Sequence, residues 1–188
     1  KYPYDPSGKM AGGAEEFDLP DPLIWLTWVA AHTTRIKLAT GILIVPQRNP
    51  VITAKELATL DHLSGGRMVL GVGAGWLAEE FAALDVPFHD RGKRLDEYIA
   101  VMRALWSGEK TTFSGDYFDF ENCISLPRPT NGTIPVIVGG HSTAAAKRAG
   151  RIGDGFFPGS ASATEIGELI TLVRQTAEDH GRDPDSIE

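Results

Sequence analysis

The chain has 188 residues, of which 42% are hydrophobic and 23% are charged, as expected for one globular domain with a sizeable core. Its net charge of −7 and its lack of long basic runs argue against nucleic acid or an anionic membrane as a partner. No apolar run approaches the roughly 20 residues of a membrane span. Cys123 is the only cysteine and the histidines are scattered, which predicts no disulfide, no metal site and a cytoplasmic location.

Both ends of the chain have the composition of connecting segments. Residues 1–20 are rich in Pro, Gly and Asp without hydrophobic periodicity, so we expect a loop there. The chain lacks an initiator Met, and residues 183–188 are polar and contain Pro. We therefore expect residues 1–188 to be an excerpt of a single domain that is incomplete at both ends.

The first half of the chain alternates helical and strand patterns. Asp21-Pro22 and Asn49-Pro50 each place a capping side chain before a proline at the first helical position. β-branched apolar runs predict strands that are buried on both faces. The predicted elements are a helix over 22–32, a strand over 36–45, a helix over 50–63 and a strand over 68–72.

The second half continues this alternation after one interruption. Aromatic residues alternate around a Ser-Gly-Asp turn at 114–116, which predicts a hairpin-like insertion over 111–126. The other predicted elements are helices over 77–84 and 91–106, a strand over 135–140, a helix over 142–149, a strand over 153–157 and a helix over 163–180.

Strands that are each followed by a helix predict an α/β fold with parallel strands and right-handed crossovers. Two architectures remain open, an open doubly wound sheet and a (β/α)8 barrel, of which this chain would be the middle part. We expect the apolar Trp25, Trp28 and Trp106 in the core. Lys147 and Arg148 are expected to be solvated.

Three predicted strands end in glycine or small polar residues: Thr40-Gly41-Ile42, Gly71 to Gly75, and Gly139-Gly140-His141-Ser142. Ligands bind at the carboxyl ends of parallel strands, so all three segments are expected on one rim. The last segment suits a phosphate, because its glycines allow close approach and a helix N-terminus follows. The alternative is a plain turn in which Ser142 caps the helix.

The glycines of the other two segments also allow two interpretations. Gly73-Ala-Gly-Trp-Leu-Ala78 fits the dinucleotide pattern, but no strand ending in an acid follows about 20 residues later. Tight strand-to-helix packing beside a flat ligand explains these glycines better. Gly41 indicates either a bulge that a ligand approaches or a packing concession to a neighbouring helix.

Together these segments resemble the bacterial luciferase-like flavin and deazaflavin oxidoreductases, particularly the branch that depends on coenzyme F420. The resemblance covers about residues 20–160 and rests on three stretches, 35–50, 55–76 and 138–155. It implies a (β/α)8 TIM barrel of the luciferase-like type, of which this chain holds about the third to sixth strands. It also implies a cis peptide at Gly41-Ile42 beneath the cofactor ring.

The resemblance implies a role for each rim segment. Thr40, Gly41 and Ile42 are expected to support the ring, and Gly139, Gly140, His141 and Ser142 to bind the phosphate. Gly73, Ala74, Gly75, Trp76 and Glu79 are expected to line the ring's side. A sugar-phosphate dehydrogenase of this family carries a carboxylate at the position of Trp76, so activity on glucose 6-phosphate is not implied.

In such proteins the bound ring carries the hydride, while the protein orients the substrate and excludes water. Glu79 and His141 are the candidates for proton transfer on the rim. The resemblance favours an oxidoreductase that uses F420 to act on a small organic substrate, and we expect it to form a homodimer. The alternatives are an FMN-dependent monooxygenase and a flavin-binding protein without turnover.

Overall fold

The computed structural model describes residues 18–159 and 161–188, so most of the loop expected over residues 1–20 lies outside the described residues. The helices are α1 (Pro22–His32), α2 (Pro50–Ser64), α3 (Ala78–Ala83), α4 (Arg91–Trp106), α5 (Thr143–Ile152) and α6 (Ala163–Asp179). The strands are β1 (Leu38–Ala39), β2 (Leu43–Ile44), β3 (Met68–Gly73), β4 (Thr111–Ser114), β5 (Asp119–Cys123), β6 (Val136–Gly139) and β7 (Gly155–Phe157).

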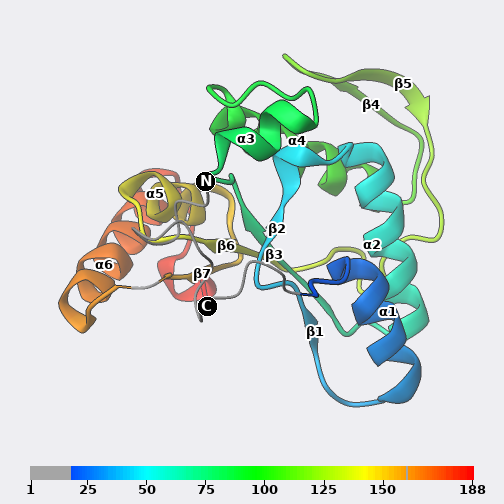
Figure 1. Cartoon of the computed structure of the whole chain (residues 1–188), viewed down its shortest axis with the longest axis horizontal. Helices are drawn as coiled ribbons and strands as arrows, with labels where there is room; N and C mark the ends of the chain where they lie inside the picture. The colour runs from blue at the N-terminus through cyan, green and yellow to red at the C-terminus, as the bar shows by residue number, and fades with distance from the viewer. Residues whose placement is uncertain (1–17, 160) are drawn as a thin grey trace.

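The main sheet is parallel, and its strands lie side by side in the same order in which they occur in the sequence. Both β1 and β2 pair with β3, β3 pairs with β6, and β6 pairs with β7. A doubly wound sheet reverses its strand order at a switch point, whereas a barrel continues in one direction. The described strands therefore form an arc of a βα barrel. In Figure 1, α1 and α2 lie to the right of the strands, α3 and α4 above them, and α5 and α6 to the left.

Local sequence signals set the helix ends. The Asp21 carboxylate accepts hydrogen bonds from the amides of Leu23 and Ile24, at 2.9 and 3.1 Å, and so caps α1. Asn49 caps α2 in the same way, and Gly65 ends that helix in the left-handed conformation. The predicted boundaries of α1 and α2 are thus confirmed to within one residue.

The continuous strand predicted over residues 36–45 is wrong. Pairing with β3 is interrupted at Thr40–Ile42, which leaves the two short strands β1 and β2. The backbone turns at the Gly41-Ile42 peptide, which is cis. Ile36 is also 53% exposed, because it precedes the point where the chain enters the sheet.

Helices α2 and α4 pack on each other, and their buried side chains join those of β3 and β6 in one core. Trp106 is buried there, and its Nε1 donates a 3.1 Å hydrogen bond to the carbonyl of Ala54. The prediction for the other two tryptophans is wrong, since Trp25 is 54% and Trp28 63% exposed. Helix α1 is apolar around most of its circumference, so it cannot bury every large side chain against one neighbouring helix.

The predicted insertion is the antiparallel hairpin of β4 and β5, which stands apart from the main sheet (Figure 1). The Glu97 carboxylate of α4 fixes its turn by accepting hydrogen bonds from the amides of Asp116, Tyr117 and Phe118 at 2.8, 2.8 and 2.9 Å. The Tyr98 ring packs edge-on against the ring of Phe118. Helix α4 therefore anchors the turn of the insertion.

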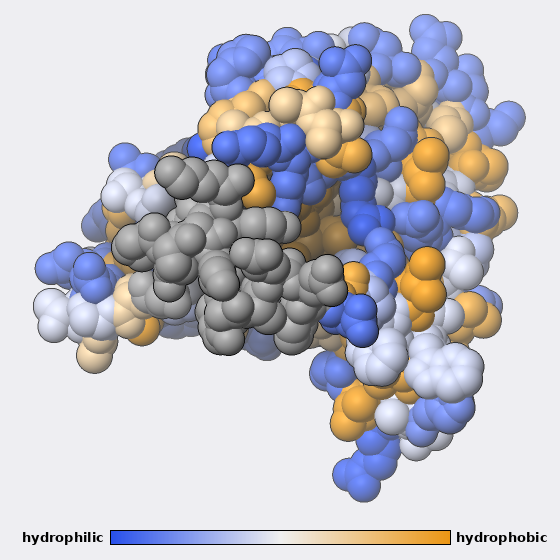
Figure 2. All heavy atoms as spheres, viewed as in Figure 1, coloured by the Kyte–Doolittle hydropathy of each residue, from blue (hydrophilic) through white to orange (hydrophobic). Residues whose placement is uncertain are grey.

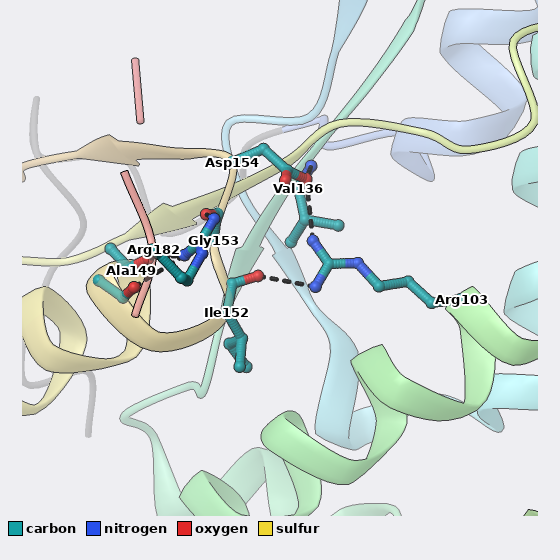
Figure 3. A network of polar contacts seen from close by, with 8 residues as sticks. Arg103, Val136, Ala149, Ile152, Gly153, Asp154 and Arg182 are labelled. Carbon is teal, nitrogen blue, oxygen red and sulfur yellow. Dashed lines mark hydrogen bonds and ion pairs between the residues drawn. The ribbon is translucent and has the colours of Figure 1, made fainter. Parts of the chain in front are cut away.

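A polar network ties the other end of the sheet to α4 (Figure 3). Arg103 donates to the carbonyl of Ile152 at 2.8 Å and to the Asp154 carboxylate at 2.9 Å. The same carboxylate oxygen accepts from the amide of Val136 at 2.8 Å, where β6 begins. Arg182 donates to three carbonyls beside it, those of Ala149, Gly150 and Gly153. These groups lie at the amino ends of the strands, opposite the expected rim, and serve the fold.

Candidate functional site

Residues 40–42 form the centre of the rim. Thr40 is buried, and its hydroxyl donates a 2.7 Å hydrogen bond to the carbonyl of Gly71 in β3. The cis peptide that the resemblance implies is present between Gly41 and Ile42. The Ile42 side chain is 37% exposed and lies over the neighbouring strands. Figure 2 shows an apolar hollow beside this part of the sheet.

The glycines of β3 and β6 give residues 40–42 room to approach. A β-carbon on Gly71 would lie 2.0 Å from the Thr40 carbonyl oxygen. Similar β-carbons on Gly73 and Gly139 would lie 2.2 and 2.6 Å from carbons of Ile42. Side chains at these three positions would therefore displace the segment, and the three glycine-marked strand ends do meet at one place.

This contact corrects one interpretation of the β3 glycines. Strand-to-helix packing accounts only for Gly75, where a β-carbon would lie 2.7 Å from the Phe81 ring of α3. Gly71 and Gly73 instead accommodate residues of the adjacent strand segment. The dinucleotide pattern at 73–78 is thus a product of close strand packing, and the sequential strand order excludes a Rossmann sheet.

Gly41 differs from these glycines because a β-carbon there would meet no described atom within 4 Å. The packing concession considered for this position is therefore wrong. A side chain at Gly41 would project into open space next to Ile42. That space is a cradle in which a flat ring could lie against bare backbone, so the residues present fit a flavin or deazaflavin.

The loop after β3 is held by an arginine that the sequence pattern did not single out. The Arg91 Nε donates a 3.0 Å hydrogen bond to the carbonyl of Gly75, which has a φ of +84°. The guanidinium also lies 3.8 Å from the centroid of the Phe88 ring. A cation in the first turn of a helix is unfavourable against the helix dipole. Arg91 at the start of α4 is such a cation, and this could have singled it out in the sequence. Trp76 follows on this loop and is 47% exposed.

The turn from β6 to α5 contains the predicted phosphate segment. Gly140 has a φ of +133°, and its amide donates to the carbonyl of Phe157 at 3.1 Å. Ser142 caps α5, since its hydroxyl oxygen accepts from the amide of Ala145 at 3.2 Å. The capping role considered as the alternative is therefore present. It leaves the hydroxyl proton available to a ligand.

The two candidates for proton transfer lie on different elements of the rim. Glu79 is exposed in the first turn of α3 and His141 is exposed in the turn before α5. Within residues 18–159 and 161–188, Glu79 has no hydrogen bond or ion pair. A β-carbon at Gly159 would lie 3.2 Å from the His141 Nδ1, which places that ring beside the end of β7. No described contact joins Glu79 and His141.

Over the same described ranges, no three His, Cys, Asp or Glu residues are grouped closely enough to bind a metal. None of the described helices is both long and apolar enough to cross a membrane. The rim thus offers bare backbone, apolar carbon and helix N-terminal amides as its binding groups.

A parallel βα arc with open space against bare backbone at the carboxyl ends of its strands defines a protein of the α/β-barrel class. The model of the luciferase-like monooxygenase family matches residues 7–188. The chain belongs to this family, and its fold is the luciferase-like α/β barrel, of which the described strands form an arc.

Known proteins of this fold include enzymes of both cofactor types. The chain is 35% identical over 175 residues to an F420-dependent glucose-6-phosphate dehydrogenase of Kineococcus radiotolerans, covering 90% of this chain and 51% of that protein. The coenzyme F420 dependent tetrahydromethanopterin reductase of Methanopyrus kandleri has a TM-score of 0.80 at 26% identity, covering 90% of this chain and 53% of the other.

A riboflavin lyase solved with modified FMN and riboflavin has a TM-score of 0.83 at 27% identity, with coverage of 91% and 44%. The chain spans about half to three fifths of the length of the curated relatives it matches.

Proposed function

We propose that the protein is an oxidoreductase that transfers a hydride between coenzyme F420 and a small organic substrate. The observation that carries this proposal is the open cradle at Gly41, bounded by Ile42 where it packs on Gly73 and Gly139. The relative in Kineococcus and the reductase in Methanopyrus, both F420-dependent by name, favour the deazaflavin.

Each rim segment has a part in this function. When bound, the deazaflavin ring supplies the carbon that accepts or donates the hydride. Thr40, Gly41 and Ile42 support the ring, while Gly73, Ala74, Gly75, Trp76 and Glu79 line its side and keep water from it. Gly139, Gly140, His141 and Ser142 hold the phosphate with backbone amides and the α5 N-terminus. Glu79 or His141 moves the proton that accompanies the hydride.

An FMN-dependent monooxygenase is the second candidate function. The family's description names monooxygenases, and the riboflavin lyase of the same fold was solved with modified FMN. The same cradle accepts either ring, because bare backbone and apolar carbon do not distinguish a flavin from a deazaflavin.

Titration of the intact protein with F420 and with FMN, followed by fluorescence, tests both candidates. Binding of F420 alone supports the first function, and binding of FMN alone supports the second. Oxygen uptake with the reduced cofactor identifies the monooxygenase. Binding without turnover of any offered substrate fits a flavin-binding protein, and binding of neither cofactor contradicts the proposal.

The cellular form of the protein is also a proposal. We infer a homodimer in the cytoplasm, since α1 exposes Ile24, Trp25 and Trp28 and the chain has a single cysteine. Light scattering of the purified protein measures the oligomeric state. A monomer at micromolar concentration contradicts the dimer.

A further inference from the structure

A positively charged groove lies between the N-terminal halves of α4 and α5. Its volume is about 710 Å³, and its charged walls are Lys93 and Asp96 of α4 and Lys147, Arg148 and Arg151 of α5. The strands that precede these helices, β3 and β6, are paired neighbours within the sheet. The groove is therefore bounded by adjacent βα units of this chain.

The acidic groups of the groove do not balance its basic groups. Asp96 is shared by Arg151, at 2.7 Å, and by Arg148, so one carboxylate serves two guanidinium groups. Asp90 also lines the groove, but it is paired at 2.9 Å with Arg94.

The remaining cations of the groove face solvent. Lys93 and Lys147 are exposed and have no ion pair with a described residue. The prediction that Arg148 is solvated is wrong, because Asp96 and the Gly92 carbonyl hold it at 9% exposure. The groove thus combines two fixed guanidinium groups with two free ammonium groups, on a chain whose net charge is −7.

A second groove, of about 350 Å³, flanks the other side of the α5 N-terminus and has the opposite character. His141 and Thr143 line it together with Glu165 and Glu168 of α6. Hydrogen bonds from the Ser162 hydroxyl and amide lower the pKa of Glu165. The two carboxylates make this groove acidic at neutral pH. An anionic chain that leaves the Ser142 turn is attracted towards α4 and repelled from α6.

We propose that the groove between α4 and α5 binds the anionic tail of the deazaflavin cofactor, an inference that rests on the proposed function. Ala144, which lines the groove, lies two residues beyond Ser142. A tail that continues from a phosphate at the Ser142 turn therefore meets Lys147 and Lys93 next. FMN ends at its single phosphate and does not reach these lysines, so the groove gives the site a preference for F420.

The test reverses the two exposed charges in the intact protein, as Lys93→Glu with Lys147→Glu. Lys37→Glu is the matched control, since Lys37 is exposed before β1, at the opposite ends of the strands. Fluorescence titrations compare F420 carrying several tail carboxylates with the deazaflavin riboside that lacks the phosphate and the tail. FMN is the third ligand.

We expect the double variant to bind tailed F420 about tenfold more weakly than the wild type, with a smaller difference at high salt. Its affinity for the riboside and for FMN should equal that of the wild type, and Lys37→Glu should change none of the three affinities. Circular dichroism that matches the wild type shows that the double variant is folded.

Three outcomes overturn the inference. The first is that the wild type binds tailed F420 and the riboside with equal affinity. The second is that the double variant loses affinity for all three ligands by the same factor. The third is that Lys37→Glu loses as much F420 affinity as the double variant does. In each of these outcomes the wild type still binds F420, so the proposed function stands. Failure of the wild type to bind any deazaflavin is distinct, because it contradicts the proposed function first.

Discussion

The side chain of Ile42 lies directly over Gly139, so that a β-carbon on Gly139 would stand 2.6 Å from the Ile42 Cγ2. The two residues are 97 positions apart in the sequence, since Ile42 directly precedes β2 and Gly139 ends β6. Their contact closes one side of the cradle. It makes the shape of the site depend on a matched pair, one large residue and one residue without a side chain.

Gly139→Ala should therefore destabilise the fold by about 1–3 kcal/mol through overpacking, and weaken cofactor binding as Ile42 is displaced. Adding Ile42→Ala should relieve the overpacking, so the double variant should be more stable than the sum of the single effects predicts. Urea unfolding of the four proteins in this cycle measures the coupling. Additive free energies of unfolding would show that the two side chains do not compete for space.

Gly41→Val tests the cradle itself. The valine side chain would enter the open space beside Ile42, so binding of F420 should fall by at least about tenfold while the fold persists. Gly41→Ala is the smaller step and should give an intermediate loss. Fluorescence titration measures the affinity and thermal unfolding checks the fold. Wild-type affinity in Gly41→Val would place the ring elsewhere.

The helix boundaries show how far the sequence predicts this fold. Capping residues such as Asp21 and Asn49 act on amides two or three positions away, so their effect is visible in a short window. The apolar run over residues 36–45 has the composition of one strand, and within it only Gly41 indicated the bulge at which the pairing with β3 is interrupted. The exposure of Trp25 depends on which helices lie beside α1, which composition does not specify.

The site was predicted as a set of segments but not as a set of contacts. Glycine at the strand ends correctly indicated that three segments share a rim. Gly73 and Gly139 lack a side chain because Ile42 occupies that space. Since Ile42 is distant from both in the sequence, the residues around each glycine do not indicate this contact. The assignment of these residues to a ring and a phosphate remains a prediction that the titrations test.

Asp21 links the α1 cap to an ion pair with Arg48. Burial raises the pKa of Asp21, but the hydrogen bond from Arg48 and those from the Ile24 and Leu23 amides outweigh it, and the pKa lies below 3.8. Folding thus favours the ionised form. The stabilisation is complete above this value and is lost as the pH falls through the lowered pKa.

Two substitutions separate the contributions of Asp21. Asp21→Ala should cost about 1–2 kcal/mol at neutral pH by removing both the cap and the ion pair. Asp21→Asn should cost less, since asparagine caps well without a charge. The difference between wild type and Asp21→Asn should shrink as the pH falls below 3.8. A difference that is constant over this range, measured by urea unfolding, would exclude the ion pair as its source.

Arg103 is predicted to matter for stability and not for the cofactor. Arg103→Ala leaves the Val136 amide as the one partner of the Asp154 carboxylate among the described residues and removes a hydrogen bond to the Ile152 carbonyl. We expect a loss of about 1–3 kcal/mol in the free energy of unfolding, with F420 affinity unchanged. Lys110→Ala, an exposed cation with no described ion pair, is the control. Weaker F420 binding by folded Arg103→Ala would show that the two ends of the sheet are coupled.

The hairpin of β4 and β5 follows α4, and the chain then returns to place β6 directly beside β3. An insertion at this point alters neither the strand order nor the spacing of the rim segments. A change in its length would leave β3 and β6 paired and the open space at Gly41 unchanged. Since the Glu97 carboxylate of α4 fixes its turn, the hairpin is held from outside the main sheet, and its loss would break none of the pairs between the parallel strands.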